Sequence, residues 1–316
     1  MRIGIFVSET WGGGSDVAEV RARAQRAEAL GFASAWVPYL PWSLDALASI
    51  QAAGDATRAI ALGTAVIPTY LFHPLALARQ AATVQAAIGR PIELGIGCSN
   101  EAVIAMHGLA YERPAQHVRE YLGVLDAALR AGAAPAGERE HAGLVQFEGE
   151  LFRVGSIYGT PGASPLGSVL VGALGPLMLR AAGALADGTI ATWSPPRAIE
   201  RAIAPELRRA AQDAGRPEPR IAGVVPVLVT NDAARARDAA RAHFATYMQL
   251  PRYRRMVELG GTDDIADACI VGDERAVAGA LARYADAGMT DLLAAPLSDA
   301  GATWERTAEA LAALAR

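Results

Sequence analysis

Along the whole chain, short apolar runs alternate with longer Ala-rich stretches in which apolar positions recur every three or four residues. The short runs are apolar at nearly every position, which is typical of parallel strands buried on both faces. We therefore predict a parallel sheet covered by helices. The predicted strands are 2–7, 34–37, 60–67, 92–97, 168–174, 188–192, 221–230 and 290–296.

The stretches between the strands carry signals of helix ends. The clearest helices are predicted over 16–31, 74–89 and 273–288. The first opens with a capping-box pattern in Asp16 and Glu19, and the second has a proline at its first position. Each of the three ends at a glycine, the residue that most often closes a helix.

Eight strands, each followed by a helix, predict an α/β fold of the (β/α)8 TIM-barrel type in one domain, residues 1–316. A doubly wound open sheet usually has fewer strands and ranks second. Two stretches, about 132–165 and 247–272, break the rhythm and are interpreted as insertions in βα loops. The first contains 143–155, whose alternating pattern is typical of a β-hairpin.

Composition narrows the classes of function. The net charge of −4 and the pI near 5.8 argue against a nucleic-acid partner. All 29 basic residues are Arg, which excludes a Walker A loop, a Lys Schiff base and pyridoxal phosphate anchoring. The two cysteines, Cys98 and Cys269, cannot form a disulfide scaffold or a CxxC zinc site. The chain has no signal-peptide pattern and no apolar run long enough for a membrane span, so a soluble cytoplasmic protein is expected.

In barrels of this type the active site lies at the carboxyl ends of the strands. One such end reads Gly172, Ala173, Leu174 and Gly175, and a helix opens directly afterwards. Small residues there would let backbone N–H groups approach a phosphate, but they also suit close strand–helix packing, and both interpretations stay open. The end of strand 92–97 lacks the third glycine of a dinucleotide-binding fingerprint.

Polar candidates for catalysis are few. Glu9 follows the first strand and is either an acid–base group or a solvated loop carboxylate. His73 precedes a helix and either caps it or takes part in catalysis. Cys98 ends a strand and is either a small buried thiol or a nucleophile. His107 and His117 fit no metal-binding spacing, so no metal site is expected.

Five stretches occur in order over nearly the whole chain. They are "AEALGFASAWV" (27–37), "LGTAVIPTYLFHPLALARQAATVQA" (62–86), "IELGIG" (92–97), "RPAQHVREYL" (113–122) and "VGALGPLMLRAAGALADGT" (171–189). Together they resemble the luciferase-like monooxygenase superfamily, especially its coenzyme F420-dependent oxidoreductases. The resemblance implies a TIM-type barrel, coenzyme F420 or alternatively FMN as the cofactor, a small-molecule substrate, and a homodimer.

The resemblance also implies the cofactor-binding residues. A non-prolyl cis peptide at the end of the third strand is matched by Ala65–Val66 and would press backbone against one face of the cofactor ring. Contacts to the ring and the ribityl chain are implied for Gly97, Cys98 and Ser99. The stretch from Gly172 to Gly175 is implied to hold the phosphate.

Two departures from the family pattern bear on the reaction. Many F420-dependent dehydrogenases carry an Asp-His pair after the second strand, where this chain has Tyr39 and Leu40. Their acidic residue after the fourth strand is matched by Asn100. Proton transfer would then fall to Glu9, Tyr39 or His73, or to solvent. Ene or imine reduction is therefore favoured over alcohol oxidation.

The leading hypothesis is an F420-dependent oxidoreductase that transfers hydride between the deazaflavin and a small organic substrate. The alternatives are an FMN-dependent monooxygenase and a non-catalytic flavin-binding barrel. Arg197 is a candidate contact for the acidic oligoglutamate tail of F420. An apolar substrate wall is expected from Trp11, Tyr39, Trp42, Tyr70 and Phe72.

Overall fold

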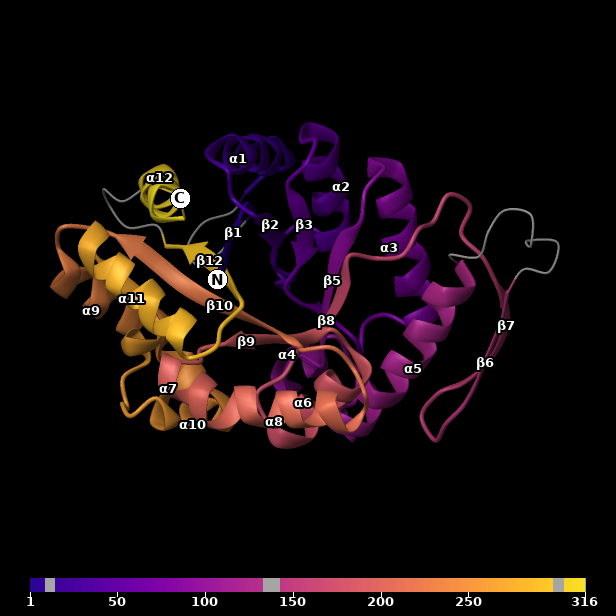
Figure 1. Ribbon diagram of the computed structural model, residues 1–316. Coiled ribbons are helices and arrows are strands. Elements are labelled where there is room, and N and C mark those ends of the chain that lie inside the picture. The colour runs from indigo at the N-terminus through magenta and orange to yellow at the C-terminus, as the bar shows by residue number, and fades with distance from the viewer. Residues whose placement is uncertain (9–14, 133–142, 298–303, 316) are drawn as a thin grey trace.

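The computed structural model describes residues 1–8, 15–132, 143–297 and 304–315. Among these residues, parallel strands form a closed ring of eight, as the (β/α)8 prediction requires (Figure 1). In ring order they are β1 (Arg2–Phe6), β2 (Ser34–Val37), β3 (Ala61–Thr64), β5 (Ile92–Gly97), β8 (Ser168–Gly172), β9 (Gly188–Thr192), β10 (Arg220–Val229) and β12 (Asp291–Pro296), which pairs with β1.

Helices surround this ring, and their ends follow the predicted signals. The Asp16 side chain accepts the Glu19 N–H at 2.8 Å, while Gly31 and Gly89 close their helices with φ of +86° and +70°. No helix within the described ranges has the length and apolar character needed to cross a membrane. The helices are α1 (Val17–Leu30), α2 (Ala46–Ala56), α3 (Pro74–Ile88), α4 (Glu101–Met106), α5 (Pro114–Gly132), α6 (Pro176–Leu185), α7 (Pro196–Ala198), α8 (Ala204–Asp213), α9 (Ala233–Phe244), α10 (Pro251–Leu259), α11 (Glu274–Asp286) and α12 (Trp304–Leu314).

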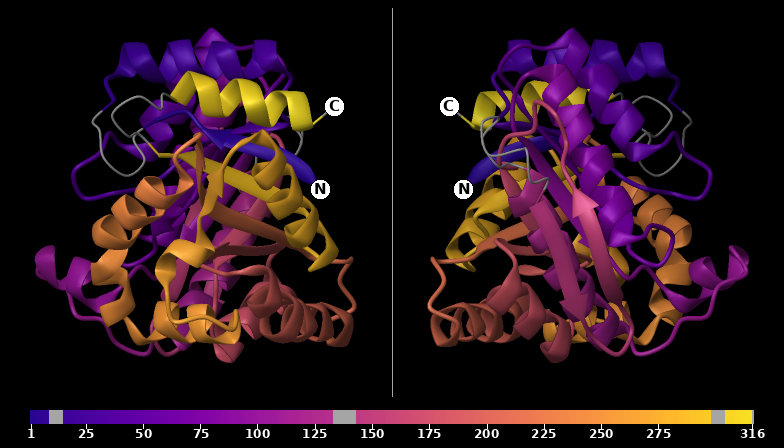
Figure 2. Two further views of the ribbon diagram at one scale, coloured as in Figure 1. Left: turned by 90° about the vertical axis from the view of Figure 1, so that its left-hand side faces the viewer. Right: turned by 90° about the vertical axis from the view of Figure 1, so that its right-hand side faces the viewer.

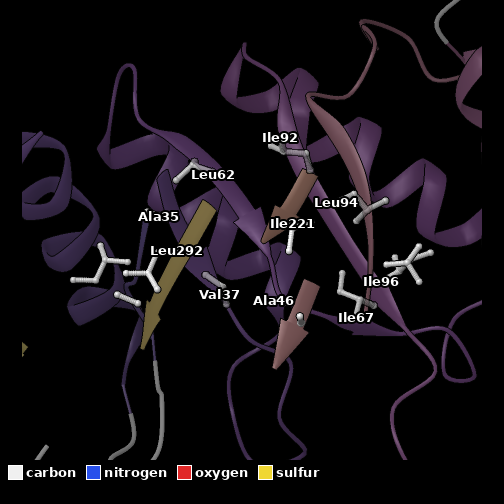
Figure 3. Close-up of a cluster of buried hydrophobic side chains, with 14 of the residues drawn as sticks. Ala35, Val37, Ala46, Leu62, Ile67, Ile92, Leu94, Ile96, Ile221 and Leu292 are labelled. Carbon is white, nitrogen blue, oxygen red and sulfur yellow. The ribbon is translucent and has the colours of Figure 1, made fainter. Parts of the chain in front are cut away.

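The strands bury both of their faces. Their outward side chains, such as Leu62, Ile92 and Leu94, pack against the helices in the main hydrophobic core (Figure 3). A smaller cluster fills the inside of the ring around the fully buried Trp36. A Cβ atom at Gly63 would lie 2.4 Å from the Trp36 indole, so a glycine is needed where the strand passes this ring.

The first predicted insertion is a hairpin, but its position in the fold differs from the prediction. Strands β6 (Gly143–Glu148) and β7 (Arg153–Tyr158) pair antiparallel after α5 and before β8. The hairpin therefore belongs to a connection from a helix to a strand, and the expectation of a βα loop was wrong here. Figure 2 shows it along the outside of the barrel. Glu120 on α5 anchors it by accepting the N–H groups of Leu151 and Phe152 at 2.8 and 3.1 Å.

The second insertion, 247–272, lies between α9 and α11, in the crossover that starts at the carboxyl end of β10. It contains α10 and ends in β11 (Ile270–Gly272), which pairs parallel with β10. This crossover brings α10 to the end of the barrel where the functional residues gather.

Candidate active site

The third barrel strand carries a bulge at its carboxyl end. Gly63 pairs with Glu93, and Ile67, which opens the short β4 (Ile67–Pro68), pairs with Ile96. Residues 63 to 67 span four steps, whereas 93 to 96 span three, so one extra residue is inserted on the third strand. The Ala65–Val66 peptide bond inside this bulge is cis, which confirms the prediction.

A threonine closes the gap that the bulge leaves in the ladder. The Thr64 hydroxyl donates to the Gly95 carbonyl and accepts the Gly95 N–H, both at 3.0 Å. A Cβ atom on Gly95 would lie only 2.0 Å from the Thr64 carbonyl oxygen. Gly95 therefore permits the close approach, and Thr64 replaces the missing backbone partners. Together they hold Ala65 and Val66 at the mouth of the barrel.

We expect Thr64→Val to lower the free energy of unfolding by about 1–3 kcal/mol, because two buried backbone groups of Gly95 lose their partner. Valine has nearly the shape of threonine, so the change removes mainly the hydroxyl. Urea unfolding followed by circular dichroism measures the loss. Thr64→Ser, which keeps the hydroxyl, should lose less. Equal stability of wild type and Thr64→Val would show that the hydroxyl does not lock the bulge.

Two cavities open beside the bulge, at the carboxyl ends of the strands. Their volumes are about 200 and 240 Å³. Because they share lining residues, we treat them as two lobes of one cleft and name them the aromatic lobe and the glycine lobe. The shared residues are Ala65, Val66, Ser99, Thr192 and Tyr253.

The glycine lobe collects the predicted cofactor-binding residues. Ala65, Val66 and Ser99 lie on the side it shares with the aromatic lobe. Its remaining predicted members are Gly97, Cys98, Gly172, Ala173, Leu174 and Gly175. Cβ atoms at two of these glycines, Gly97 and Gly172, would lie 2.9 and 3.4 Å from a methyl group of Val66. Larger side chains there would press against the bulge.

The amino end of α6 opens into the glycine lobe. Gly175 is the N-cap residue, and no side chain caps this helix. A Cβ atom at Gly175 would meet nothing within 4 Å. Uncapped N–H groups at a helix start, with the positive end of the helix dipole, form a site for an anion. Arg252 of α10 lines the same lobe, and its guanidinium lies 5.0 Å from the ring of Tyr253.

Cys98 is a neutral wall residue of the glycine lobe. Burial raises the pKa of its thiol, although a hydrogen bond with Tyr111 and the charge of Arg252 act in the opposite direction. The thiol sulfur lies 3.1 Å from the Tyr111 hydroxyl. A thiol with a raised pKa is a poor nucleophile at neutral pH, so the arrangement favours the buried-thiol interpretation.

The aromatic lobe is lined by Tyr39, Trp42, Trp193 and Tyr247 together with the shared Tyr253. Two residues that bound the cleft have left-handed backbone conformations, with φ of +59° at Ser99 and +56° at the fully buried Trp193. Such conformations are uncommon for a bulky residue and cluster at functional sites.

Asn100 lines the aromatic lobe and is the N-cap residue of α4. Its side-chain oxygen accepts the Val103 N–H at 2.9 Å and so caps the helix. The oxygen is thereby fixed, and the NH2 group of the amide can donate to a ligand in the aromatic lobe, which Asn100 also lines. Tyr39, the other described candidate that lines this lobe, packs edge-on against Phe72 at 5.9 Å between ring centroids. Catalytic roles for both residues stay predictions.

The remaining candidates lie elsewhere. His73 is exposed, and its Nδ1 accepts the Leu75 N–H at 3.3 Å, so it caps α3 and does not line either lobe. Glu9 and Trp11 lie outside the described residues. A catalytic role for Glu9 or His73 also stays a prediction.

Part of the expected substrate wall and the expected tail contact lie away from the cleft. Tyr70 stacks on His117 at 3.9 Å, and neither Tyr70 nor Phe72 lines a lobe. Arg197 lies beside Gly261, outside both lobes. The aromatic residues missed from the sequence are Trp193, Tyr247 and Tyr253, and the missed cation is Arg252. The available signal was "PRYRRM" at 251–256, a basic and aromatic run inside the predicted insertion.

The chain is similar in sequence and in fold to known F420-dependent enzymes. An F420-dependent glucose-6-phosphate dehydrogenase of Nakamurella multipartita is 29% identical over 296 residues, which cover 90% of this chain and 82% of the relative. A 5,10-methylenetetrahydromethanopterin reductase of Methanolobus tindarius is 26% identical over 273 residues, covering 84% and 79%. The structure of an F420-dependent secondary alcohol dehydrogenase with an F420-acetone adduct superposes with a TM-score of 0.81 at 18% identity, covering 99% of this chain and 97% of that one.

The family model described as luciferase-like monooxygenase matches residues 1–316, the full length of the sequence. The barrel, the bulged third strand and the glycine-rich start of α6 are the parts of the structure that correspond to the stretches carrying the resemblance. This chain therefore belongs to the luciferase-like monooxygenase family.

Proposed function

We propose that this protein is a coenzyme F420-dependent oxidoreductase that exchanges a hydride with a small organic substrate, and that it favours ene or imine reduction. The residues that line the glycine lobe are the evidence for a phosphate-bearing cofactor. The relatives with F420 in their names support the choice of F420 over FMN. The scarcity of acid–base groups in the cleft supports the type of reaction.

The residues of the glycine lobe fit such a cofactor. The uncapped start of α6 and the open space at Gly175 suit its phosphate. The Ala65–Val66 backbone offers a flat contact for its ring system, next to Gly97 and Gly172. Arg252 supplies a positive charge for the acidic tail of F420. FMN has no such tail. When bound, F420 supplies hydride exchange at its C5 atom; the chain binds it, orients it and excludes water.

One observation carries the preference for ene or imine reduction. Among the described residues, no Asp, Glu or His lines either lobe. Alcohol oxidation needs a base that accepts the hydroxyl proton, whereas reduction of a double bond needs only a proton donor. Burial, aided by the charge of Asp45, raises the pKa of Tyr39. Tyr39 therefore stays protonated near neutral pH and can donate a proton or a hydrogen bond, and solvent can take the same role.

An FMN-dependent monooxygenase is the second candidate, because the description of the matched family model names that activity. FMN would use the same glycine lobe and the same phosphate site. FMN carries no acidic tail, so in that lobe Arg252 could act only on its phosphate. The non-catalytic flavin-binding barrel, the third candidate, predicts cofactor binding without turnover of any substrate.

Anaerobic titration of the purified protein with oxidised F420 and with reduced FMN separates these candidates. We expect a micromolar or tighter dissociation constant for F420 and one at least tenfold higher for FMN. Arg252→Ala should weaken F420 binding by about tenfold, roughly 1.4 kcal/mol, and weaken FMN binding less. Arg255→Ala, an exposed arginine on the same helix, is the control. Tighter binding of FMN would favour the monooxygenase, and binding of neither would remove the cofactor assignment.

A further inference from the structure

The aromatic lobe is bounded by two groups of rings on opposite sides of the barrel. Tyr39 and Trp42 follow β2, and Trp193 follows β9. From β2 the ring runs through β3, β5 and β8 to β9, which is four steps in a ring of eight. Strands four steps apart lie across the barrel from each other, so the two groups of rings lie on opposite sides of the lobe that both line.

Ring contacts hold most of these aromatic side chains in place. Trp193 is fully buried, and its ring lies 5.1 Å from Tyr247, which in turn lies 5.6 Å from Tyr253. On the other side, Tyr39 packs edge-on against Phe72, whereas Trp42, 67% exposed, lies at the mouth. Aromatic walls favour flat ligands, because ring faces gain most contact by stacking or edge-to-face packing.

The described residues of the lobe offer no compensation for a charged ligand. Every described residue that lines it is uncharged. The undescribed segments that follow β1 and β12, residues 9–14 and 298–303, contain no Arg or His in their sequence, and the whole chain contains no Lys. Arg252 lines the glycine lobe instead. An anion in the aromatic lobe would therefore lose water without gaining a counter-charge, which is strongly unfavourable.

Resting on the proposed hydride-transfer function, we propose that the aromatic lobe selects uncharged, planar ring compounds that carry a neutral hydrogen-bond acceptor, and that it rejects phosphorylated and carboxylated compounds. The NH2 group of Asn100 and the hydroxyl of Tyr39 supply the donors for that acceptor. The substrate class thus differs from the sugar phosphate in the name of the Nakamurella relative. The absence of a positive charge among the described residues of the aromatic lobe disfavours anionic substrates, and the aromatic contacts favour flat ones.

The test compares matched ligands on the protein loaded with oxidised F420. Calorimetric titrations with coumarin, coumarin-3-carboxylate and glucose 6-phosphate give the three dissociation constants. We expect coumarin to bind at least thirtyfold more tightly than its carboxylate, and glucose 6-phosphate not to saturate. Trp42→Ala should weaken coumarin binding about tenfold and leave the F420 dissociation constant unchanged. Ile157→Ala, an exposed apolar residue on the hairpin, is the control.

A variant that gains affinity for an anion tests the same inference in the opposite direction. Leu40→Arg places a cation among the residues that line the lobe and should raise the affinity for coumarin-3-carboxylate at least tenfold. If F420 binds but the carboxylate or glucose 6-phosphate binds as tightly as coumarin, or coumarin does not bind, the substrate inference is overturned. If F420 itself does not bind, the proposed function fails, and the two failures are distinguishable.

Discussion

Gly175→Asp is expected to raise the dissociation constant of F420 at least a hundredfold while leaving thermal stability unchanged or slightly higher. Gly175 is the N-cap of α6, its backbone φ is −89°, and a Cβ atom there meets no neighbour within 4 Å. An aspartate can therefore fit without strain, and Asp is a better N-cap residue than Gly. Its carboxylate would accept the N–H groups and place a negative charge where the cofactor phosphate is proposed to bind.

The expected loss of F420 affinity is large because the aspartate carboxylate would replace the phosphate as the partner of the N–H groups at the start of α6. A hundredfold loss corresponds to about 2.7 kcal/mol, which combines lost phosphate hydrogen bonds with repulsion between like charges. Gly175→Asn has the same shape and caps the helix without the charge, so it should lose about tenfold. Gly159→Asp puts a carboxylate at an exposed glycine just after the hairpin, with equal open space, and should change nothing.

Fluorescence titration and thermal melting, made on the same preparations, check the prediction. Gly175→Asp that keeps wild-type affinity and a wild-type melting temperature would show that the phosphate does not lie at the start of α6. A variant that melts well below wild type would instead point to a structural role for Gly175. The Asn variant then separates the effect of shape from the effect of charge.

The barrel could be predicted because its signals are local. Strands 34–37, 92–97 and 188–192 have the predicted bounds, since apolar runs buried on both faces are visible without knowledge of the partner strand. The run 60–67 could not be resolved in the same way. Its break into β3 and β4 depends on the register with β5 and on the pairing of Thr64 with Gly95, which are 31 residues apart.

The candidate site was predictable where the family pattern carries it. The cis peptide and the glycine-rich start of α6 lie in stretches that resemble the family, and both have the expected place in the structure. Arg252, Tyr247 and Tyr253 come from an insertion, whose path after β10 depends on how α9 and α10 pack. His73 shows the opposite case, because its local signal fitted both a helix cap and a catalytic group, and the structure shows the cap.

At the end of the barrel opposite the cleft, an arginine joins four strands. Arg220 opens β10, and its guanidinium pairs with Glu93 on β5 and lies 3.1 Å from Asp291, the first residue of β12. It also donates to the Ser168 hydroxyl at 2.9 Å, while Arg2 pairs with Asp291 at 2.8 Å. The side chains of Arg220, Glu93 and Asp291 are 19%, 14% and 4% exposed, so water replaces little of this network.

We expect Arg220→Met to lower the free energy of unfolding by about 3–5 kcal/mol, because it leaves the carboxylates of Glu93 and Asp291 buried with less counter-charge. Methionine keeps most of the length of the side chain, so the loss reports mainly on charge. Urea unfolding near pH 7 measures it. Arg208→Met, which breaks an exposed pair with Glu218, should cost less than about 1 kcal/mol. The F420 affinity of the folded variant should be unchanged, because the cleft lies at the other end of the strands.

The difference in free energy of unfolding between wild type and Arg220→Met should shrink as the pH falls. Burial by itself raises the pKa of Asp291, but hydrogen bonds from Arg220 and Thr290 and the charge of Arg220 outweigh it, so the pKa is lowered overall. In wild type, the stabilisation from Asp291 is therefore fully present above its unfolded pKa, near 3.9, and is lost as the pH falls through its folded pKa. Without Arg220 the Asp291 carboxylate stabilises the folded state less, so acidification removes more stability from wild type than from the variant. Unfolding measured near pH 5, 4 and 3, a range that extends below that unfolded pKa, should show the two proteins converging. A constant deficit across that range would mean that Arg220 acts through packing alone.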